Sequence, residues 1–334
     1  MKKTCIVLLI AICLVTSVFA AGSAETGSKS EKTYTIKVGL PEALDNPVGI
    51  MSTMIKNQVE KESNGRLKVE LYPSNQLGGP REMLEAVGLG NIEMTVCTPS
   101  DLSSFVPEMG ILTFPYLFKD EQQAYSLLDG EIGVELSAKA EKQGFKILGY
   151  PEIGFRQITN NVRPLTKAED FNGIKIRARA SAHQAAFKKL GANPASISFS
   201  ELYAAMQQRV VDAQENSTTN IYFNNFYEVQ KYLSVTNTFY DAWSITINNN
   251  FYQNLPSDLK IILQNAVDAG VVYNRLSTSA ENAEYLDKLS ELMQVNHIEP
   301  KEMDRIVSIA QSIYSDFADA IGRDLVDRVL NALK

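Results

Sequence analysis

The run of residues 257–293 constrains the fold most, because apolar side chains recur in it at near-helical spacing over an unusual length. A single helix of this kind extends by about 1.5 Å per residue, far enough to run behind two lobes as a common spine. Two shorter helices broken near Gly270 or Ser277 are the alternative. The apolar positions are Leu259, Ile262, Leu263, Val267, Val271, Leu276, Ala280, Tyr285, Leu289 and Leu292.

From Thr33 onward the chain alternates strand and helix patterns. Tyr34, Ile36 and Val38 alternate with polar residues as in a half-buried strand, and helical spacing over 51–59 leads to a second strand over 67–71. The next patterns predict a helix over 81–88, a buried strand over 94–97, and helix over 121–143 with a break at 129–130. This order predicts an α/β lobe whose helices cover a mostly parallel sheet.

A second lobe is predicted to begin near Gly154. Its strands are expected over 155–160, 174–179 and 210–213, and its helices over 181–190 and 199–208. A strand over 243–248 then precedes the long helical run. We expect lobe I to comprise residues 33–153 plus 242–281, and lobe II to comprise residues 154–241 plus 282–334.

The N-terminus predicts export. Residues 1–20 run from two lysines through an apolar block to a small–x–small site at Ala20, which is typical of a cleaved signal peptide. The apolar block is shorter than the roughly 20 residues of a spanning helix. A lipoprotein processed at Cys13 is a minor alternative, because Ile12 precedes it where a small residue is expected. Residues 21–32 are predicted to be a flexible leader, and the mature protein is expected in the periplasm.

Composition excludes several classes of function. Loss of Lys2 and Lys3 with the signal takes the formal net charge from −7 to −9, and the acidic residues are spread along the chain, so nucleic acid is not an expected partner. Only Cys97 survives processing, so stability must come from a large core rather than from an internal disulfide. His183 and His297 do not stand at metal-ligand spacing, so neither a metal nor a cofactor is expected.

Two arginines and an amide carry the chemistry of the second lobe. Arg177 lies on one side of the predicted strand 174–179, Arg156 lies in a separate strand, and Asn216 follows the predicted strand 210–213. Ligands of open α/β sheets bind outside the carboxyl ends of strands, where these three residues can converge. A guanidinium fork matches the two oxygens of a carboxylate. The sequence therefore predicts a receptor for an organic carboxylate, although a solvated strand face alone would look similar.

Three further residues are candidates for the pocket. Glu42 lies with Asp45 and Asn46 in the loop after the first strand and can face the ligand from lobe I; a solvated loop is the alternative. Tyr240 and Trp243 can wall the pocket with aromatic surface or can be ordinary core residues.

Several motifs resemble the solute-binding subunits of tripartite ATP-independent periplasmic (TRAP) transporters, dicarboxylate-binding type. The matches run in order over nearly the whole mature chain. They are Tyr-Pro-Ser-Asn-Gln-Leu-Gly at 72–78, Gly-Ile-Lys-Ile-Arg at 173–177, Leu-Gly-Ala-Asn-Pro at 190–194, Ser-Glu-Leu-Tyr-Ala-Ala-Met-Gln-Gln at 200–208, Val-Asp-Ala-Gln-Glu-Asn at 211–216 and Phe-Tyr-Glu-Val-Gln-Lys-Tyr-Leu at 226–233.

The resemblance implies a two-lobed, hinged periplasmic binding protein fold whose long helix spans both lobes. Such a protein closes on an organic anion and hands it to a membrane permease. In the family, the positions of Arg177, Arg156 and Asn216 supply the principal carboxylate salt bridge and two supporting contacts. C4-dicarboxylates, 2-oxo acids, uronates and other sugar acids all fit this description, and the sequence leaves the oligomeric state open.

The chain also departs from the family. Ala178 and Arg179 stand where the common form has Val-Pro, and Ser217 replaces a frequent proline, so the pocket shape is expected to differ. Thr98, a further candidate for the pocket, lies in a loop where some sialic-acid-binding members carry a glutamate, which makes sialic acid a poor fit. Two other functions stay open at this point: a secreted enzyme acting on acidic sugars, with Tyr240 or a carboxylate pair as acid or base, and a periplasmic sensor subunit.

Overall fold

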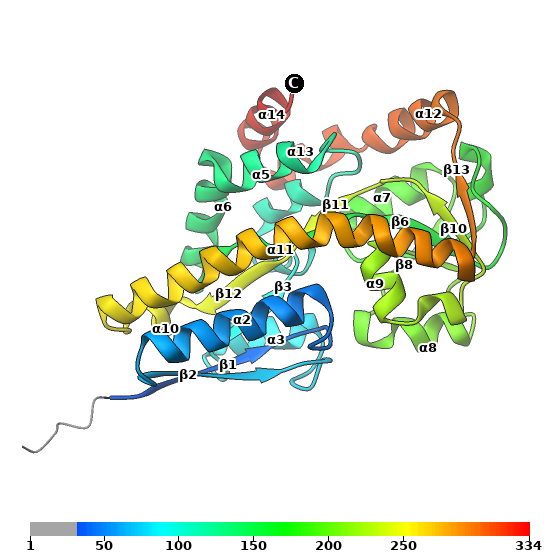
Figure 1. The fold of residues 1–334 in the computed structure, drawn as a ribbon. Helices are drawn as coiled ribbons and strands as arrows, with labels where there is room; N and C mark the ends of the chain where they lie inside the picture. The colour runs from blue at the N-terminus through cyan, green and yellow to red at the C-terminus, as the bar shows by residue number, and fades with distance from the viewer. Residues whose placement is uncertain (1–31) are drawn as a thin grey trace, which may run out of the picture. The chain divides into compact units, whose positions relative to one another are not determined.

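The computed structural model describes residues 32–334, so the predicted signal peptide and nearly all of the predicted leader lie outside the described residues. Residues from Tyr34 to Lys334 form one compact unit. Two large sheets, a two-stranded connection and one long helix organise this unit (Figure 1). We call the half built on the five-stranded sheet lobe I and the half built on the six-stranded sheet lobe II.

The sheet of lobe I has the strand order β2-β1-β3-β12-β4. Strands β1, β2 and β3 pair in parallel, whereas β12 runs antiparallel to its neighbours β3 and β4. Strand β4 therefore runs in the same direction as β1, β2 and β3, and the sheet is mostly parallel, as predicted, with β12 reversed. The antiparallel strand arrives from the second half of the chain. The five strands are β1 (Tyr34–Gly39), β2 (Leu67–Tyr72), β3 (Met94–Cys97), β4 (Phe145–Gly149) and β12 (Ser244–Asn248).

Helices cover both faces of this sheet. On one face Ile36 and Val38 of β1 pack in a core with Met51 of α2 and with the long helix. On the other face Phe145 of β4 packs in a core with helix residues that include Met83 and Leu136. The predicted break at residues 129–130 is confirmed. The helices are α2 (Pro47–Glu62), α3 (Pro80–Leu89), α4 (Pro99–Leu102), α5 (Glu121–Asp129), α6 (Glu131–Lys142) and α10 (Asn249–Gln253), with the 3₁₀ helix η1 (Pro107–Thr113).

The sheet of lobe II is mixed, with the strand order β13-β10-β6-β9-β7-β8. Its strands are β6 (Gln157–Asn160), β7 (Lys175–Arg177), β8 (Asn193–Ala195), β9 (Ala213–Asn216), β10 (Tyr232–Val235) and β13 (Gln294–His297). Its helices are α7 (Ser181–Lys189), α8 (Leu202–Gln207), α9 (Thr218–Phe223) and α12 (Pro300–Gln311), with the 3₁₀ helices η2 (Ala168–Phe171), η3 (Phe199–Glu201) and η4 (Phe226–Glu228).

Two predicted strands of lobe II were wrong in detail. The strand predicted over 155–160 is two strands, β5 (Glu152–Phe155) and β6, because the backbone of Arg156 bonds to Phe239 and Thr238 instead of continuing one ladder. The strand predicted over 210–213 begins later, as β9, because Arg209 has a φ of 58° and Val210 is 55% exposed in the preceding turn. Asn216 is consequently the last residue of its strand.

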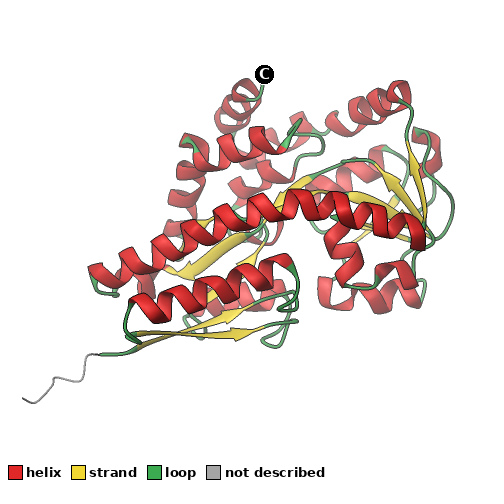
Figure 2. Cartoon of the chain, viewed as in Figure 1, coloured by secondary structure: helices red, strands yellow, loops and turns green. Residues whose placement is uncertain are grey.

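The lobes are joined by β5, its antiparallel partner β11 (Tyr240–Ala242) and the helix α11 (Ser257–Leu292). Helix α11 is continuous over 36 residues, so the alternative of a break near Gly270 or Ser277 is wrong (Figure 2). It packs on α2 in lobe I, on β5, and on α9 and β13 in lobe II. Gly270 permits the close approach to α2, because a Cβ there would lie 2.7 Å from a carbon of Ile55.

The two C-terminal helices, α13 (Tyr314–Ile321) and α14 (Arg323–Ala332), bury Ile321, Leu325 and Val329 in the apolar cluster of η1, α5 and α6. This packing departs from the predicted assignment of residues 282–334 to lobe II, because the apolar faces of these helices find their partners in lobe I. The remaining lobe boundaries stay a prediction. Among residues 32–334, no helix combines the length and apolar character that a membrane crossing requires.

Candidate functional site

A small cavity of about 290 Å³ lies where the two lobes meet the connecting strands. Glu42 follows β1, Thr98 follows β3 and Asn216 ends β9, so the cavity sits at the carboxyl ends of strands, as predicted. Five of the predicted site residues line it, and Arg177 and Tyr240 do not. The lining consists of Glu42, Pro80, Thr98, Asp101, Ile153, Arg156, Arg179, Phe199, Asn216, Asn220 and Trp243.

Arg177 ends β7 and is fully buried beside this cavity. Its Nε donates to the carbonyl oxygen of Ile197 at 3.0 Å, two residues before the cavity residue Phe199. Its Nη1 and Nη2 are buried without a hydrogen-bond partner among the described residues. Burial, followed by the neighbouring Arg179, lowers its pKa to about 9, so the group is still charged at neutral pH. A buried charged fork without an acceptor costs free energy that an anion would recover.

Arg156 is equally buried, but its donors are taken. Its Nε forms a short ion pair with the Glu215 carboxylate, its Nη2 donates to the Glu215 carbonyl oxygen at 2.8 Å, and its Nη1 donates to Asp241 at 3.3 Å. Although burial favours the neutral acid, Arg156 and His183 hold the pKa of Glu215 well below its usual range. Arg156, which lies between β5 and β6, therefore ties this junction to β9 and β11 at the wall of the cavity.

Arg179 is a site residue that the sequence prediction did not include. Its Nη1 donates to Thr98 Oγ1 at 3.1 Å and to the two carboxylate oxygens of Asp101 at 3.3 and 3.2 Å. Its Nη2 donates to Asp241 at 3.2 Å. Burial lowers the pKa of a guanidinium, but Asp101 and Asp241 raise the pKa of Arg179 above its ordinary value. Arg179 thus bonds lobe II to lobe I and to a connecting strand.

Glu42 reaches the cavity from lobe I. Its Oε2 accepts from Asn224 Nδ2 at 2.9 Å, whereas its Oε1 is buried without a partner among the described residues. Burial, opposed by Asn224 and the arginines, raises its pKa to about 7. Asp45, in the same loop, is exposed to solvent.

Asparagines also bridge the two lobes. Asn46 donates to Asn220 Oδ1 at 3.3 Å, and Asn220 donates to Asn216 Oδ1 at 3.2 Å. The Nδ2 of Asn216 is buried without a partner among residues 32–334. Asn216 therefore keeps one free donor at the cavity.

The other predicted site residues lie either in the cavity wall or in the apolar core. Thr98 caps α4 and accepts from Arg179, so it is a wall residue on lobe I. Trp243 is 6% exposed, lines the cavity and packs in the core of lobe I. The Tyr240 ring instead packs edge-on against Phe118 and Phe155, at centroid distances of 5.5 and 5.3 Å. The structure does not bring Tyr240 to the cavity, because side chains alternate along β11 and its neighbour Asp241 faces the arginines.

Three acidic residues that the sequence prediction left out surround the arginines. Asp101, Glu215 and Asp241 come from α4, β9 and β11 and each accepts from Arg156 or Arg179. Glu215 lies in the same motif as Asn216, but a glutamate in a sequence does not show which arginine it pairs with. Asp241 lies two residues before Trp243, and on a strand this spacing places both side chains on the same face, which was the one sequence signal for Asp241. No group of His, Cys, Asp and Glu within residues 32–334 is placed to hold a metal ion.

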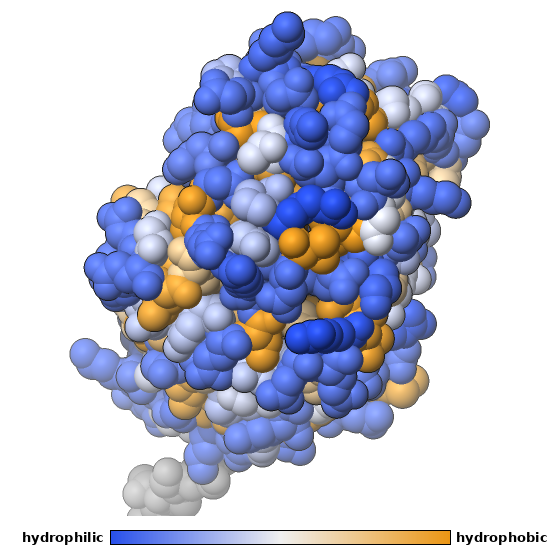
Figure 3. Space-filling model, turned by 90° about the vertical axis from the view of Figure 1, so that its right-hand side faces the viewer, coloured by the Kyte–Doolittle hydropathy of each residue, from blue (hydrophilic) through white to orange (hydrophobic). Residues whose placement is uncertain are grey.

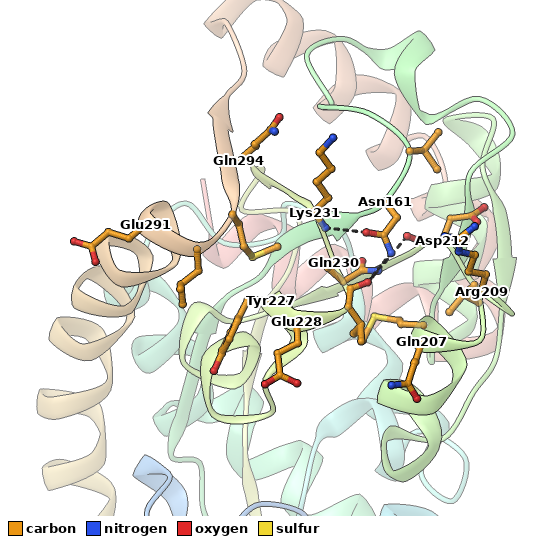
Figure 4. A pocket seen from close by; sticks show the side chains of 16 residues that line it. Asn161, Gln207, Arg209, Asp212, Tyr227, Glu228, Gln230, Lys231, Glu291 and Gln294 are labelled. Atoms are coloured by element: carbon orange, nitrogen blue, oxygen red, sulfur yellow. Dashed lines mark hydrogen bonds between the residues drawn. The ribbon is translucent and has the colours of Figure 1, made fainter.

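A larger, open groove lies in lobe II and has different properties (Figure 4). It measures about 1780 Å³ and carries both signs of charge on Arg209, Asp212, Glu228 and Lys231. None of the buried, unpartnered polar atoms of the described chain belongs to its lining. The face beside β13 and α8 is mainly hydrophilic, with apolar side chains in small separate patches (Figure 3). The buried cavity is therefore the better candidate for an anion.

Residues 41–320 match DctP, family 7 of the bacterial extracellular solute-binding proteins. The 2,3-diketo-L-gulonate-binding periplasmic protein of Escherichia coli is 30% identical over 276 residues, which cover 82% of this chain and 84% of that protein.

Two solved structures are similar over most of the chain. A TRAP periplasmic solute-binding protein of Sulfurospirillum deleyianum with bound succinate superposes with a TM-score of 0.86 at 33% identity, covering 91% of this chain and 100% of that chain. The sugar acid binding protein of Advenella mimigardefordensis in complex with galactonate has a TM-score of 0.88 at 31% identity, covering 90% and 98% of the two chains.

These matches confirm the resemblance carried by the motifs and the two-lobed α/β fold with a long helix. The family match extends from the loop after β1 to α13 and includes the whole candidate site. The chain belongs to family 7 of the bacterial extracellular solute-binding proteins, the DctP family of TRAP solute-binding proteins.

Proposed function

We propose that this chain is the extracytoplasmic solute-binding subunit of a TRAP transporter, that it binds an organic-acid anion through Arg177, and that it delivers the anion to the membrane permease. The observation that carries the proposal is the buried fork of Arg177, whose two terminal nitrogens have no partner among the described residues. The proposed location is the periplasm, after cleavage of the signal peptide near Ala20.

The chemistry of the fork favours a carboxylate. Two parallel N–H donors match two carboxylate oxygens, and the charge assistance makes such bonds short and directional. Succinate, galactonate and 2,3-diketo-L-gulonate, which the relatives bind, each carry a carboxylate. Arg156 and Asn216 are proposed to support the ligand, Arg156 by fixing the cavity wall and Asn216 by its free amide donor.

The cycle would be closure of the lobes on the anion. Contacts that join the lobes include Glu42 with Asn224, Asn46 with Asn220, and Asp101 with Arg179. Opening would break these contacts and give the ligand access, and a ligand held by both lobes would favour the closed state. Release to a permease requires moderate affinity; a dissociation constant near a micromolar corresponds to roughly −8 kcal/mol.

The first test is binding by the mature protein after removal of any ligand carried through purification. A panel of C4-dicarboxylates, 2-oxo acids, uronates and sugar acids is titrated calorimetrically. We expect one class to bind and Arg177→Ala to weaken that binding by about 2 kcal/mol or more. Arg323→Ala, which removes an exposed arginine on α14, is the matched control and should leave affinity unchanged. An unchanged isotherm for Arg177→Ala would exclude the assignment.

Delivery needs its own test. Ligand uptake into proteoliposomes that contain the cognate permease should require this protein and should fail with Arg177→Ala. Mass spectrometry of the ligand after incubation with the protein alone should return it unaltered. Conversion to a product would favour an enzyme, and ligand binding without permease-dependent uptake would favour a sensor.

A further inference from the structure

Arg179 is the part of the site that the family motifs do not explain, since it stands where the common form has a proline. Its guanidinium lies at the cavity wall, and its side chain is 14% exposed. The Asp101 carboxylate contacts Nη1 with both oxygens, and Asp241 contacts Nη2. The charge of Arg179 is therefore already matched by protein carboxylates, one of which comes from the opposite lobe.

A charge inventory of the cavity follows from these pairs. The guanidinium groups are those of Arg156, Arg177 and Arg179, and the paired carboxylates are those of Asp101, Glu215 and Asp241. Arg156 and Arg179 each have carboxylate partners, whereas Arg177 contacts only a carbonyl oxygen. Within the described residues, the site thus offers one unmatched guanidinium fork. One ligand carboxylate satisfies it.

A second ligand carboxylate would meet an unfavourable surface. It would approach the carboxyl groups of Glu42 and Asp101, and buried like charges repel strongly. The nearby Arg179 has both terminal nitrogens on Asp101 and Asp241, so it offers a second carboxylate a single N–H at Nε and no unmatched charge. Three further polar atoms at the cavity are buried without a partner among the described residues: the acceptor Glu42 Oε1 and the donors Asn216 Nδ2 and Arg179 Nε. A hydroxyl group both donates and accepts, so hydroxyls complement all three atoms, whereas an ionised carboxylate has no hydrogen to give Glu42.

We propose that Asp101 is a specificity-determining residue: by neutralising Arg179 from the opposite lobe, it makes this receptor select singly charged, hydroxyl-bearing carboxylates over dicarboxylates. This inference rests on the proposed function, because it assumes that Arg177 holds the first carboxylate. In this proposal the Arg179 guanidinium pairs with Asp101 and does not bind the ligand. Removing the Asp101 charge should release Arg179 to accept a second carboxylate.

The test compares succinate with D-erythronate, L-threonate and D-gluconate, the first three being four-carbon acids of similar size. Dissociation constants are measured at about pH 8, above the pKa of Glu42, so that Glu42 is ionised. For the wild-type protein we expect at least one hydroxy acid to bind about 100-fold more tightly than succinate. Succinate binding as tightly as the best hydroxy acid would overturn the proposal.

Asp101→Asn keeps the shape and the hydrogen-bond acceptor of the α4 cap and removes the charge. We expect it to shift the affinity ratio toward succinate by about tenfold or more. In Asp101→Asn/Arg179→Met this shift should disappear, because no guanidinium is released. Asp304→Asn, an exposed acid on α12, is the matched control. An unchanged ratio in folded Asp101→Asn contradicts the proposal, and if that variant does not fold, the wild-type ratio decides.

The two proposals fail in different ways. If no carboxylate binds, or if Arg177→Ala leaves the affinity unchanged, the proposed function fails. If succinate binds in an Arg177-dependent manner and is preferred, only the role of Asp101 fails.

Discussion

Two buried arginines of lobe II have different surroundings. Arg156 lies just before β6 and Arg177 is the last residue of β7, and their exposed fractions are 2% and 0%. Arg156 places all three of its guanidinium nitrogens on protein acceptors, whereas Arg177 places only Nε. Burial is therefore shared by a structural and a candidate binding residue. What separates them is the hydrogen-bonding capacity that the protein leaves unused, because a buried donor without an acceptor is costly.

The same contrast separates the cavity from the open groove of lobe II. The groove is the larger space, but its charged side chains lie at the surface. The amides of Asn161 and Gln230 in it are engaged, as in the bonds of Asn161 to Val229 and Lys231 (Figure 4). At the small cavity, Glu42, Arg179 and Asn216 each keep a buried atom without a partner in residues 32–334. Buried polar atoms without hydrogen-bond partners, and not the volume of the space, therefore identify the small cavity as the candidate ligand site.

The largest expected effect comes from the same substitution at both arginines. Arg156→Met leaves the buried Glu215 without a guanidinium and leaves Asp241 with Arg179 alone, so the ligand-free protein should lose about 3 kcal/mol or more of unfolding free energy. Arg177→Met removes a buried charge that has no carboxylate hydrogen-bonded to it within residues 32–334, so it should leave the unfolding free energy unchanged or raise it. Urea denaturation of the ligand-free variants measures both.

The comparison breaks if Arg177→Met is destabilised as strongly as Arg156→Met. That result would mean that the Arg177 fork has a structural partner. The exposed control Arg323→Met should change the unfolding free energy by no more than about 0.5 kcal/mol.

A smaller effect is expected on the pH dependence of binding. Burial lowers the pKa of Arg177 to about 9, and an anion binds its protonated form. The protonated fraction is nearly complete at neutral pH and falls as the pH rises through the pKa, so affinity should weaken above about pH 9 by up to tenfold per unit. The carboxylic ligand is ionised throughout this range.

Calorimetric titrations at several values from about pH 7 to 10 measure this loss. An affinity that stays constant up to about pH 10 would show that the charge of Arg177 does not contribute to binding. Circular dichroism over the same range controls for loss of structure.

The sequence predicted the parts of the fold that depend on local pattern. The strand–helix–strand unit β1-α2-β2 and the long helix α11 follow from side-chain periodicity that each segment carries within itself. The start of β9 was missed because the turn at Arg209 and Val210 adopts a backbone that the valines of that segment did not indicate. Strand β5 was missed because its end depends on pairing with β11, which lies far away in the chain.

The site was predicted to the level of residue type but not of pairing. Arg156 and Arg177 were both singled out, yet nothing local distinguishes the paired arginine from the unpaired one. The partners Glu215 and Asp241 are 59 and 85 residues from Arg156, and only the sheet register brings them together. The sequence shows that Arg179 departs from the family but does not show its partner, because Asp101 lies on the other lobe, 78 residues away in the chain.

The most direct test of the account is a crystal structure of the mature protein with the tightest-binding organic acid. We expect Arg177 Nη1 and Nη2 each to lie about 2.7–2.9 Å from one oxygen of the ligand carboxylate, with Arg156 still paired to Glu215. A ligand carboxylate held by Arg156 or Arg179 instead, with the Arg177 fork left without the anion, would contradict the central claim.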